Sequence, residues 1–115
     1  MRTTLKTLMG IEAIVLLLLA AAHFGLPIPW FAEPRVIQLA VIEGLCGLAI
    51  LYASLHGGAR TAFTVQWLAF AGVLIGMVGL ALSGAPRTPL TEFGHVLVLA
   101  MTAPGALIAD RLARD

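Results

Sequence analysis

Four apolar stretches, each about as long as a membrane-spanning helix, constrain this chain more than any other feature of its sequence. They cover residues 7–25, 36–56, 62–83 and 92–110. A helix needs about 20 mostly apolar residues to cross roughly 30 Å of hydrocarbon. Only 11% of the 115 residues are charged and the mean hydropathy is +1.00, whereas soluble domains contain about 25% charged residues. The sequence therefore predicts one transmembrane domain, residues 1–115, with four spans.

Short segments rich in proline, glycine and charge separate these stretches. They read GLPIPWFAEPR, HGGAR and SGAPRTPLTE, and their prolines and glycines interrupt helices. Connections this short make successive spans antiparallel, and an open backbone is not tolerated in lipid. We therefore predict an all-α, integral membrane, four-helix up-and-down bundle, in which Pro104–Gly105 kinks the last helix or ends its regular part.

The first apolar stretch has some features of a secretion signal. The charged MRTTLK precedes IVLLLLAAA, which is the order found in such signals. Because the apolar run continues past Ala22 to Phe24, we expect this segment to remain as the first span.

Basic residues give the predicted orientation. Positive charge is enriched in the cytoplasmic segments of membrane proteins, and five of the seven basic residues fall on the side of the two termini. We therefore expect both termini to face the cytoplasm. The inner set is Arg2, Lys6, Arg60, Arg111 and Arg114, and the outer set is Arg35 and Arg87.

The two tryptophans fall near the predicted membrane boundaries. Trp30, followed by Phe31, lies in the first outer connection, and Trp67 lies near the inner start of the third span. Tryptophan is enriched at membrane–water interfaces, so we interpret both as interfacial. For Trp30 the alternative is a stacking contact with a bound ligand.

Small residues predict where helices touch. Gly72, Gly76 and Gly79 of the third span are spaced by four and three, so they share one face, and small residues let helix backbones approach closely in lipid. We predict that this face contacts another helix, either within the bundle or in a homodimer or larger membrane complex. Gly44 and Gly47 form a shorter patch of the same kind.

A carboxylate interrupts the second span. Glu43 lies within AVIEGLCGLAI, and a charged group near the bilayer centre is costly. Such an acid faces the bundle interior, has a partner or keeps its proton. His95 enters the last span at a similar level, within reach of Glu43 if their helices are adjacent. We predict an acid–base role for both residues.

The first span carries two more polar residues. Glu12 and His23 are eleven residues apart, close to the roughly 10.8 residues of three helical turns, so they project from one face. Gln66 on the third span lies at roughly the depth of Glu12. Each span thus directs polar groups inward, which predicts a polar cavity that contains Glu12, Glu43 and His95. The last span adds an inward stripe of Thr91, His95 and Thr102.

Polar residues in membrane bundles often serve only as hydrogen-bond partners between helices, worth about 0.6 kcal/mol each. We favour this interpretation for Gln66 and the two threonines, with ligand binding as the alternative for Gln66 and Thr102. His23 either extends to the interface or contacts a ligand. A carboxylate is a costly way to obtain one hydrogen bond, so we predict functional roles for Glu43 and Glu12.

The run VIEGLCGLAILYASLHGGARTAFTVQWLAFAGVLIG resembles the central part of the DoxX-like group of small four-helix membrane proteins. In that group a second-span glutamate followed by small residues leads through a Gly/Arg-containing turn into the third span. The likeness covers residues 36–80. Glu43 is the position carried over, whereas Glu12 has no counterpart. The resemblance implies a protein of the bacterial inner (cytoplasmic) membrane, linked in some members to quinone or thiol redox systems.

Three functions fit these features. In the first, the cavity binds a lipophilic molecule such as a quinone, a polyprenyl lipid or a sterol-like compound. Its catalytic version is an isomerase or cyclase in which Glu43 protonates an alkene or epoxide and His95 or Glu12 removes a proton. In the second, a dimeric transporter exchanges protons at Glu12 or Glu43 for a cationic substrate. In the third, the protein is an accessory subunit of a larger membrane complex.

Cofactor binding is a further alternative. His23 and His95 lie toward the same side of the membrane and could ligate haem as a pair. A metal site made of Glu12, Glu43 and His95 is an alternative of similar standing to haem. Only Glu92 and His95 have the Glu-x-x-His spacing of di-iron bundles, and Glu92 falls where helix capping is expected. We predict no metal site and leave the cofactor open, with haem and quinone as candidates.

Other functional classes find no support in the sequence. It contains no phosphate-binding loop, nucleophile elbow or basic surface for nucleic acid, and its net charge is +1. The single cysteine, Cys46, lies in an apolar run and forms no intrachain disulfide. We interpret it as a small hydrophobic residue of the interior.

Overall fold

The computed structural model describes residues 2–27, 35–84 and 88–115, which form four α-helices. The helices are α1 (Thr3–His23), α2 (Ile37–His56), α3 (Ala59–Ser83) and α4 (Pro89–Arg114). Each is long and apolar enough to span a membrane, which confirms the predicted fold class. The helix ends lie within four residues of the predicted spans.

One of the two outcomes predicted at Pro104 is wrong, because α4 does not end there. The helix continues to Arg114. A proline within a helix removes one backbone N–H donor, and in membrane helices the neighbouring helices and turns compensate for such a loss. The residues beyond Pro104 therefore remain part of the fourth span.

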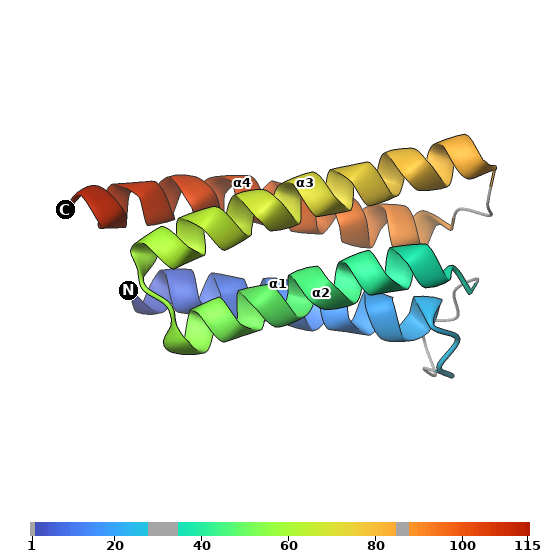
Figure 1. The fold of residues 1–115 in the computed structure, drawn as a ribbon, viewed down its shortest axis with the longest axis horizontal. Coiled ribbons are helices and arrows are strands. Elements are labelled where there is room, and N and C mark those ends of the chain that lie inside the picture. The colour runs from blue at the N-terminus through green and yellow to red at the C-terminus, as the bar shows by residue number, and fades with distance from the viewer. Residues whose placement is uncertain (1, 28–34, 85–87) are drawn as a thin grey trace.

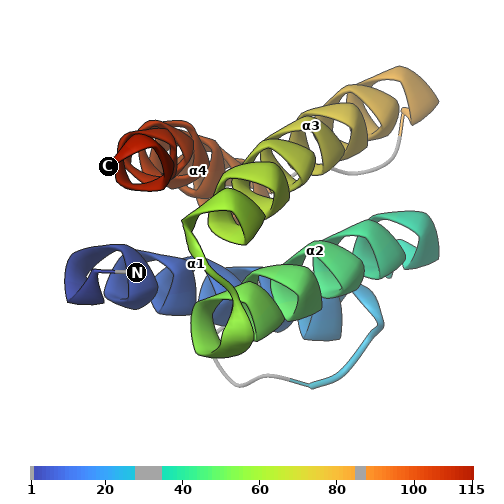
Figure 2. The same cartoon turned by 60° about the vertical axis from the view of Figure 1, so that its left-hand side comes forward.

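The helices form an up-and-down bundle (Figure 1). Both termini and the turn between α2 and α3 lie at one end, which we call the terminal end. The last turns of α1 and α3 and the first turns of α2 and α4 lie at the other, the loop end. In Figure 2 the α1–α2 hairpin lies beside the α3–α4 hairpin. Among the described residues, each helix packs on its chain neighbours, α4 packs on α1, and the diagonal pairs make no close backbone contact.

The end of α1 is fixed by its sequence. The backbone N–H groups of Gly25 and Leu26 donate to carbonyl oxygens in the last turn of α1, at 3.0 and 3.1 Å. This Schellman motif needs a left-handed residue, and Gly25 has φ +94°. The N–H of Val36 then donates to the carbonyl of His23 at 2.9 Å. These bonds hold the last residue of α1 against the start of α2.

The surface of the bundle is far more apolar than that of a soluble protein. Large apolar side chains point outward, as shown by Leu82, which is 84% exposed, and Ile75, which is 66% exposed. A bilayer accepts such a surface, whereas polar groups must find partners inside the protein. Among the described residues, the polar side chains with 1% exposure or less are Glu12, His23, Glu43, Gln66, His95 and Thr102.

The glycine face of α3 packs mainly within the bundle. A Cβ atom at Gly72 would lie 3.0 Å from the Sγ atom of the half-buried Cys46, and one at Gly76 would lie 2.9 Å from Cδ1 of Leu39. Both neighbours belong to α2. A Cβ atom at Gly79 would have no neighbour within 4 Å. Gly72 and Gly76 therefore pack against another helix of the same chain. Contact of this face with a partner protein stays a prediction.

Close packing of α1 on α2 depends on Gly47. A Cβ atom there would lie 3.0 Å from Cγ of Leu17 and 3.2 Å from Cβ of Leu16, whereas one at Gly44 would lie 3.7 Å from its nearest neighbour, Ala20. We expect Gly47→Ala to lower the free energy of unfolding by about 1–3 kcal/mol through overpacking. Gly44→Ala, one turn away, is the control and should leave it unchanged. Unfolding of both variants in mixed detergent micelles would measure this, and equal stability would contradict the packing.

Candidate functional site

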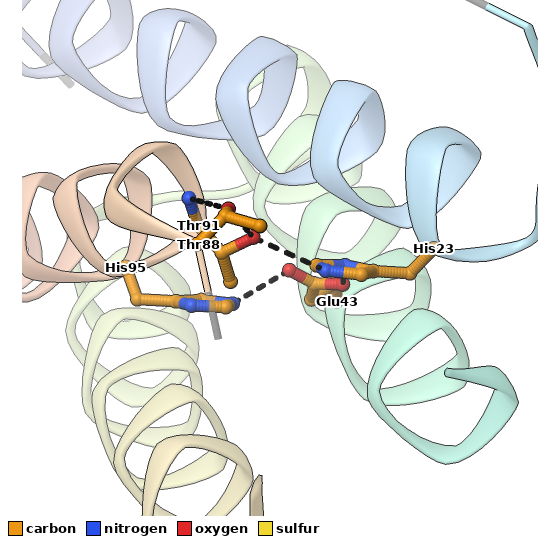
Figure 3. A network of polar contacts seen from close by, with 5 residues as sticks. All are labelled: His23, Glu43, Thr88, Thr91 and His95. Carbon is orange, nitrogen blue, oxygen red and sulfur yellow. Dashed lines mark hydrogen bonds and ion pairs between the residues drawn. The ribbon is translucent and has the colours of Figure 1, made fainter. Parts of the chain in front are cut away.

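The carboxylate of Glu43 joins three helices at the loop-end half of the bundle (Figure 3). Its Oε1 atom lies 2.6 Å from Nδ1 of His23 on α1, and its Oε2 atom lies 2.6 Å from Nε2 of His95 on α4. Glu43 is fully buried and each histidine is 1% exposed. We call these three residues the His–Glu–His cluster. Both carboxylate oxygens therefore have an imidazole partner at a short hydrogen-bonding distance.

Helix geometry explains why these side chains meet. Glu43 and His95 each lie six residues after the first residue of their helix, or about 9 Å along helices that run in the same direction. His23 is the last residue of the antiparallel α1. Side chains lean toward the N-terminus of their own helix, so His23 leans into the bundle while Glu43 leans toward the loop end. The two converge from opposite directions.

Two threonines connect this cluster to the start of α4. Thr88 is the N-cap of α4, where its Oγ1 atom accepts the N–H of Thr91 at 3.1 Å, and Pro89 follows at the first helical position. The Thr88 hydroxyl also donates to Thr91 Oγ1 at 3.0 Å, and Thr91 Oγ1 lies 3.5 Å from Nε2 of His23. A hydroxyl that donates to Nε2 leaves the proton of His23 on Nδ1, where it can be donated to Glu43.

Sequence reasoning missed Thr88, although its signal is present. A threonine followed by proline is a common helix start, because threonine caps the free N–H groups and proline fits the first turn. Sequence reasoning also predicted that His23 either extends to the membrane interface or contacts a ligand. The structure has His23 in the interior, bonded to Glu43.

The two imidazole rings do not form a haem site in this arrangement. Their planes are parallel within 3° and their centroids are 6.1 Å apart. Nδ1 of His23 and Nε2 of His95 both point to Glu43, whose carboxylate lies between the rings. Iron with two axial histidines would need this space. The residues therefore do not fit haem without displacement of Glu43.

Glu12 forms a separate polar pair toward the terminal end. Nε2 of Gln66 on α3 donates to Oε1 of Glu12 on α1 at 3.1 Å, and both side chains are fully buried. Among the described residues, Oε2 of Glu12 and Oε1 of Gln66 have no hydrogen-bond partner. A Cβ atom at Gly105 would clash with Nε2 of Gln66, so the glycine on α4 makes room for the amide.

The structure thus divides the single polar cavity that the sequence predicts. Glu12 pairs with Gln66, whereas Glu43 and His95 belong to the His–Glu–His cluster. Most of the buried core residues between the two groups are apolar. They include Leu16 and Leu19 on α1, Val73 on α3 and Val98 on α4, whereas the buried Thr102 on α4 is polar.

Thr102 and Trp30 are the two other residues predicted to bind a ligand. Thr102 is fully buried and donates within α4 to the carbonyl of Leu99 at 3.4 Å. Trp30 lies outside the described residues. Among the residues that the structure describes, no group of three His, Cys, Asp or Glu side chains could hold a metal ion.

Two hollows lie near the His–Glu–His cluster. A small pocket of about 40 Å³ is lined by His95, Thr91 and Glu92 of α4 and by Met77 and Leu80 of α3. A larger apolar groove of about 380 Å³ runs between α2 and α3 at the loop end. Its lining includes Leu39, Ile42, Ile75, Gly76, Gly79 and Leu80.

No family model, curated protein or solved structure matches this chain. The findings establish a four-helix protein with four candidate membrane spans and a buried His–Glu–His cluster. The DoxX-like resemblance remains a resemblance of residues 36–80.

The Glu12–Gln66 pair lacks one donor, which a substitution can supply. In Glu12→Gln the new amide N–H can donate to Oε1 of Gln66, so we expect the free energy of unfolding to stay the same or to rise. Glu12→Met, of similar size, leaves the Gln66 amide unpaired and should lower it by about 1–3 kcal/mol. Unfolding in mixed micelles would measure both variants. If Gln destabilises as much as Met, the pair requires an ionised carboxylate.

Proposed function

We propose that this protein binds a lipophilic molecule with a hydrogen-bonding head group, of the quinone or isoprenoid class, and exchanges a proton with it. The observation that carries the proposal is the fully buried Glu43, whose two oxygens each lie 2.6 Å from an imidazole nitrogen of another helix. The groove between α2 and α3 is the proposed binding site for the apolar part of the molecule.

The His–Glu–His cluster has the composition of a proton-transfer site. A carboxylate and two neutral imidazoles carry one negative charge, which is costly in hydrocarbon. One additional proton makes the cluster neutral and can reside on Glu43, His23 or His95. A group that holds a proton in several positions can serve as acid and as base. Hydrogen bonding between helices alone needs no such set of three titratable groups.

Leu80 links this cluster to the groove. It is 7% exposed and lines both the groove and the small pocket beside His95. A molecule in the groove would therefore be separated from His95 by one leucine side chain. A change of the Leu80 rotamer would let a carbonyl or hydroxyl head group reach the imidazole, while the apolar part stays against Gly76 and Gly79.

The catalytic version of this proposal is a membrane-embedded isomerase or cyclase. Glu43 would donate a proton to the bound molecule, and His95 would accept one. Of the two bases that the sequence suggests, His95 is favoured over Glu12, because Glu12 pairs with Gln66 in the other polar group. The DoxX-like resemblance favours a quinone as the bound molecule.

The other two functions have less support. A transporter that exchanges protons at Glu12 or Glu43 needs a path for its cationic substrate to that carboxylate, and both carboxylates are fully buried. An accessory subunit would dock through the glycine face of α3, where Gly72 and Gly76 already pack on α2. The binding proposal uses both the buried cluster and the groove.

Binding should depend on Glu43 and not on Glu12. We would incubate the purified protein with a decyl-substituted benzoquinone and with geranylgeraniol, and count bound molecules by native mass spectrometry. We expect one molecule of one probe per chain for the wild type and about a tenfold weaker affinity for Glu43→Gln, equivalent to the loss of one charge-assisted hydrogen bond. Glu12→Gln, an equally buried substitution, should bind like the wild type. Equal weakening by both substitutions would argue against the site.

The groove itself can be tested with residues that line it or lie beside it. Gly79 lines the groove, and a Cβ atom there meets nothing within 4 Å, so Gly79→Leu can fill the space without a clash at its Cβ. We expect it to abolish binding of the probe. Val78→Leu changes a neighbouring side chain that is 50% exposed and should have no effect. Unchanged binding to Gly79→Leu would exclude this groove as the site.

A further inference from the structure

A second hollow lies at the terminal end of the bundle, far along the helices from the His–Glu–His cluster. It has a volume of about 330 Å³ and is lined by the first turns of α3 and the last turns of α4. This volume is within the range of sites that bind small molecules. Its lining is Arg60, Phe63, Thr64, Asp110, Ala113 and Arg114. We call it the terminal pocket.

Asp110 orients one of the two arginines of this pocket. Nε of Arg114 donates to both carboxylate oxygens of Asp110, each at 3.1 Å. These bonds use the single inner N–H of the guanidinium, so the N–H groups of its two terminal nitrogens remain for another acceptor. Asp110 thus orients Arg114, whose side chain is 78% exposed, and neutralises one positive charge.

Arg60 contributes the second guanidinium. Among the described residues it has no ion-pair or hydrogen-bond partner for its side chain. The terminal pocket therefore has two arginines against one carboxylate. Arginine presents a planar set of donors that matches the oxygens of a phosphate group.

The level of this pocket in the bundle identifies the source of the phosphate. The four helices are long and apolar enough to span a membrane, and helices that span a bilayer end in its headgroup layer, where phosphates of lipids are abundant. Phe63 and Ala113, which are half-buried, give the pocket an apolar part, suited to the start of an acyl chain. Basic pockets between membrane helices bind anionic lipid headgroups in other proteins.

We propose that the terminal pocket binds the phosphate of an anionic phospholipid, with Arg60 and Arg114 as the phosphate ligands and Asp110 as the residue that positions Arg114. The site is independent of the proposed function at Glu43. The lipid occupies the cleft between α3 and α4 and joins the start of one helix to the end of the other.

The test is a lipid titration of the full chain in detergent, followed by native mass spectrometry. Phosphatidylglycerol and phosphatidylcholine with the same acyl chains would be compared for the wild type, Arg60→Gln, Arg114→Gln and Arg111→Gln. Arg111 is exposed on the same last turns of α4 but does not line the pocket, so it is the matched control. A parallel titration would add inorganic phosphate as a competitor.

We expect one tightly bound phosphatidylglycerol per chain and a preference over phosphatidylcholine. Arg60→Gln and Arg114→Gln should each weaken binding about fivefold, the equivalent of ~1 kcal/mol per arginine near a membrane surface, and Arg111→Gln should not. Equal weakening by all three substitutions would show a diffuse positive charge and overturn the site. Competition by inorganic phosphate at the concentration of the lipid would overturn the lipid as its source. No preference between the two lipids would also overturn the proposal.

Discussion

The pair of short hydrogen bonds at Glu43 holds the loop-end half of the bundle together. The bond to His23 joins two neighbouring helices, whereas the bond to His95 crosses from α2 to α4, two helices whose backbones make no close contact. The Glu12–Gln66 bond crosses the other diagonal, from α1 to α3. In a hydrocarbon solvent, where apolar side chains gain little by leaving lipid, such bonds favour one arrangement of the four helices over others.

The need for buried polar side chains to meet across the bundle also explains the positions of the glycines. A side chain can span a diagonal only if the neighbouring helices approach closely. Gly47 lets α2 approach α1, and Gly72 and Gly76 let α3 approach α2. Gly105 leaves the space that the Gln66 amide occupies. Small residues and buried polar residues thus act together, because the small residues shorten the distances that the polar side chains must bridge.

The sequence predicted the four spans and the burial of Glu43, because hydropathy and the cost of a charge in lipid depend on composition and depth alone. The shared depth of Glu12 and Gln66 also followed from helical rise. The sequence did not predict which side chains form hydrogen bonds across the bundle. Which helices are diagonal, and how each is rotated, depends on side-chain packing, so Glu43 and His95 were expected to need adjacent helices. His23 was hard to assign because its contact with Glu43 depends on how tightly α1 is joined to α2 at Gly25 and Val36.

In the proposed function, the position of the His–Glu–His cluster favours proton exchange with the loop end only. His23 reaches the loop end through Thr91 and Thr88, and His95 lines the small pocket beside Leu80. Toward the terminal end, the cluster is followed by apolar residues such as Leu16 and Val98. In the proposed function, a proton would therefore move between the loop end and the groove without crossing the membrane. A lipophilic molecule that enters the groove from the bilayer needs no aqueous path, so the arrangement suits chemistry on a lipid-soluble compound.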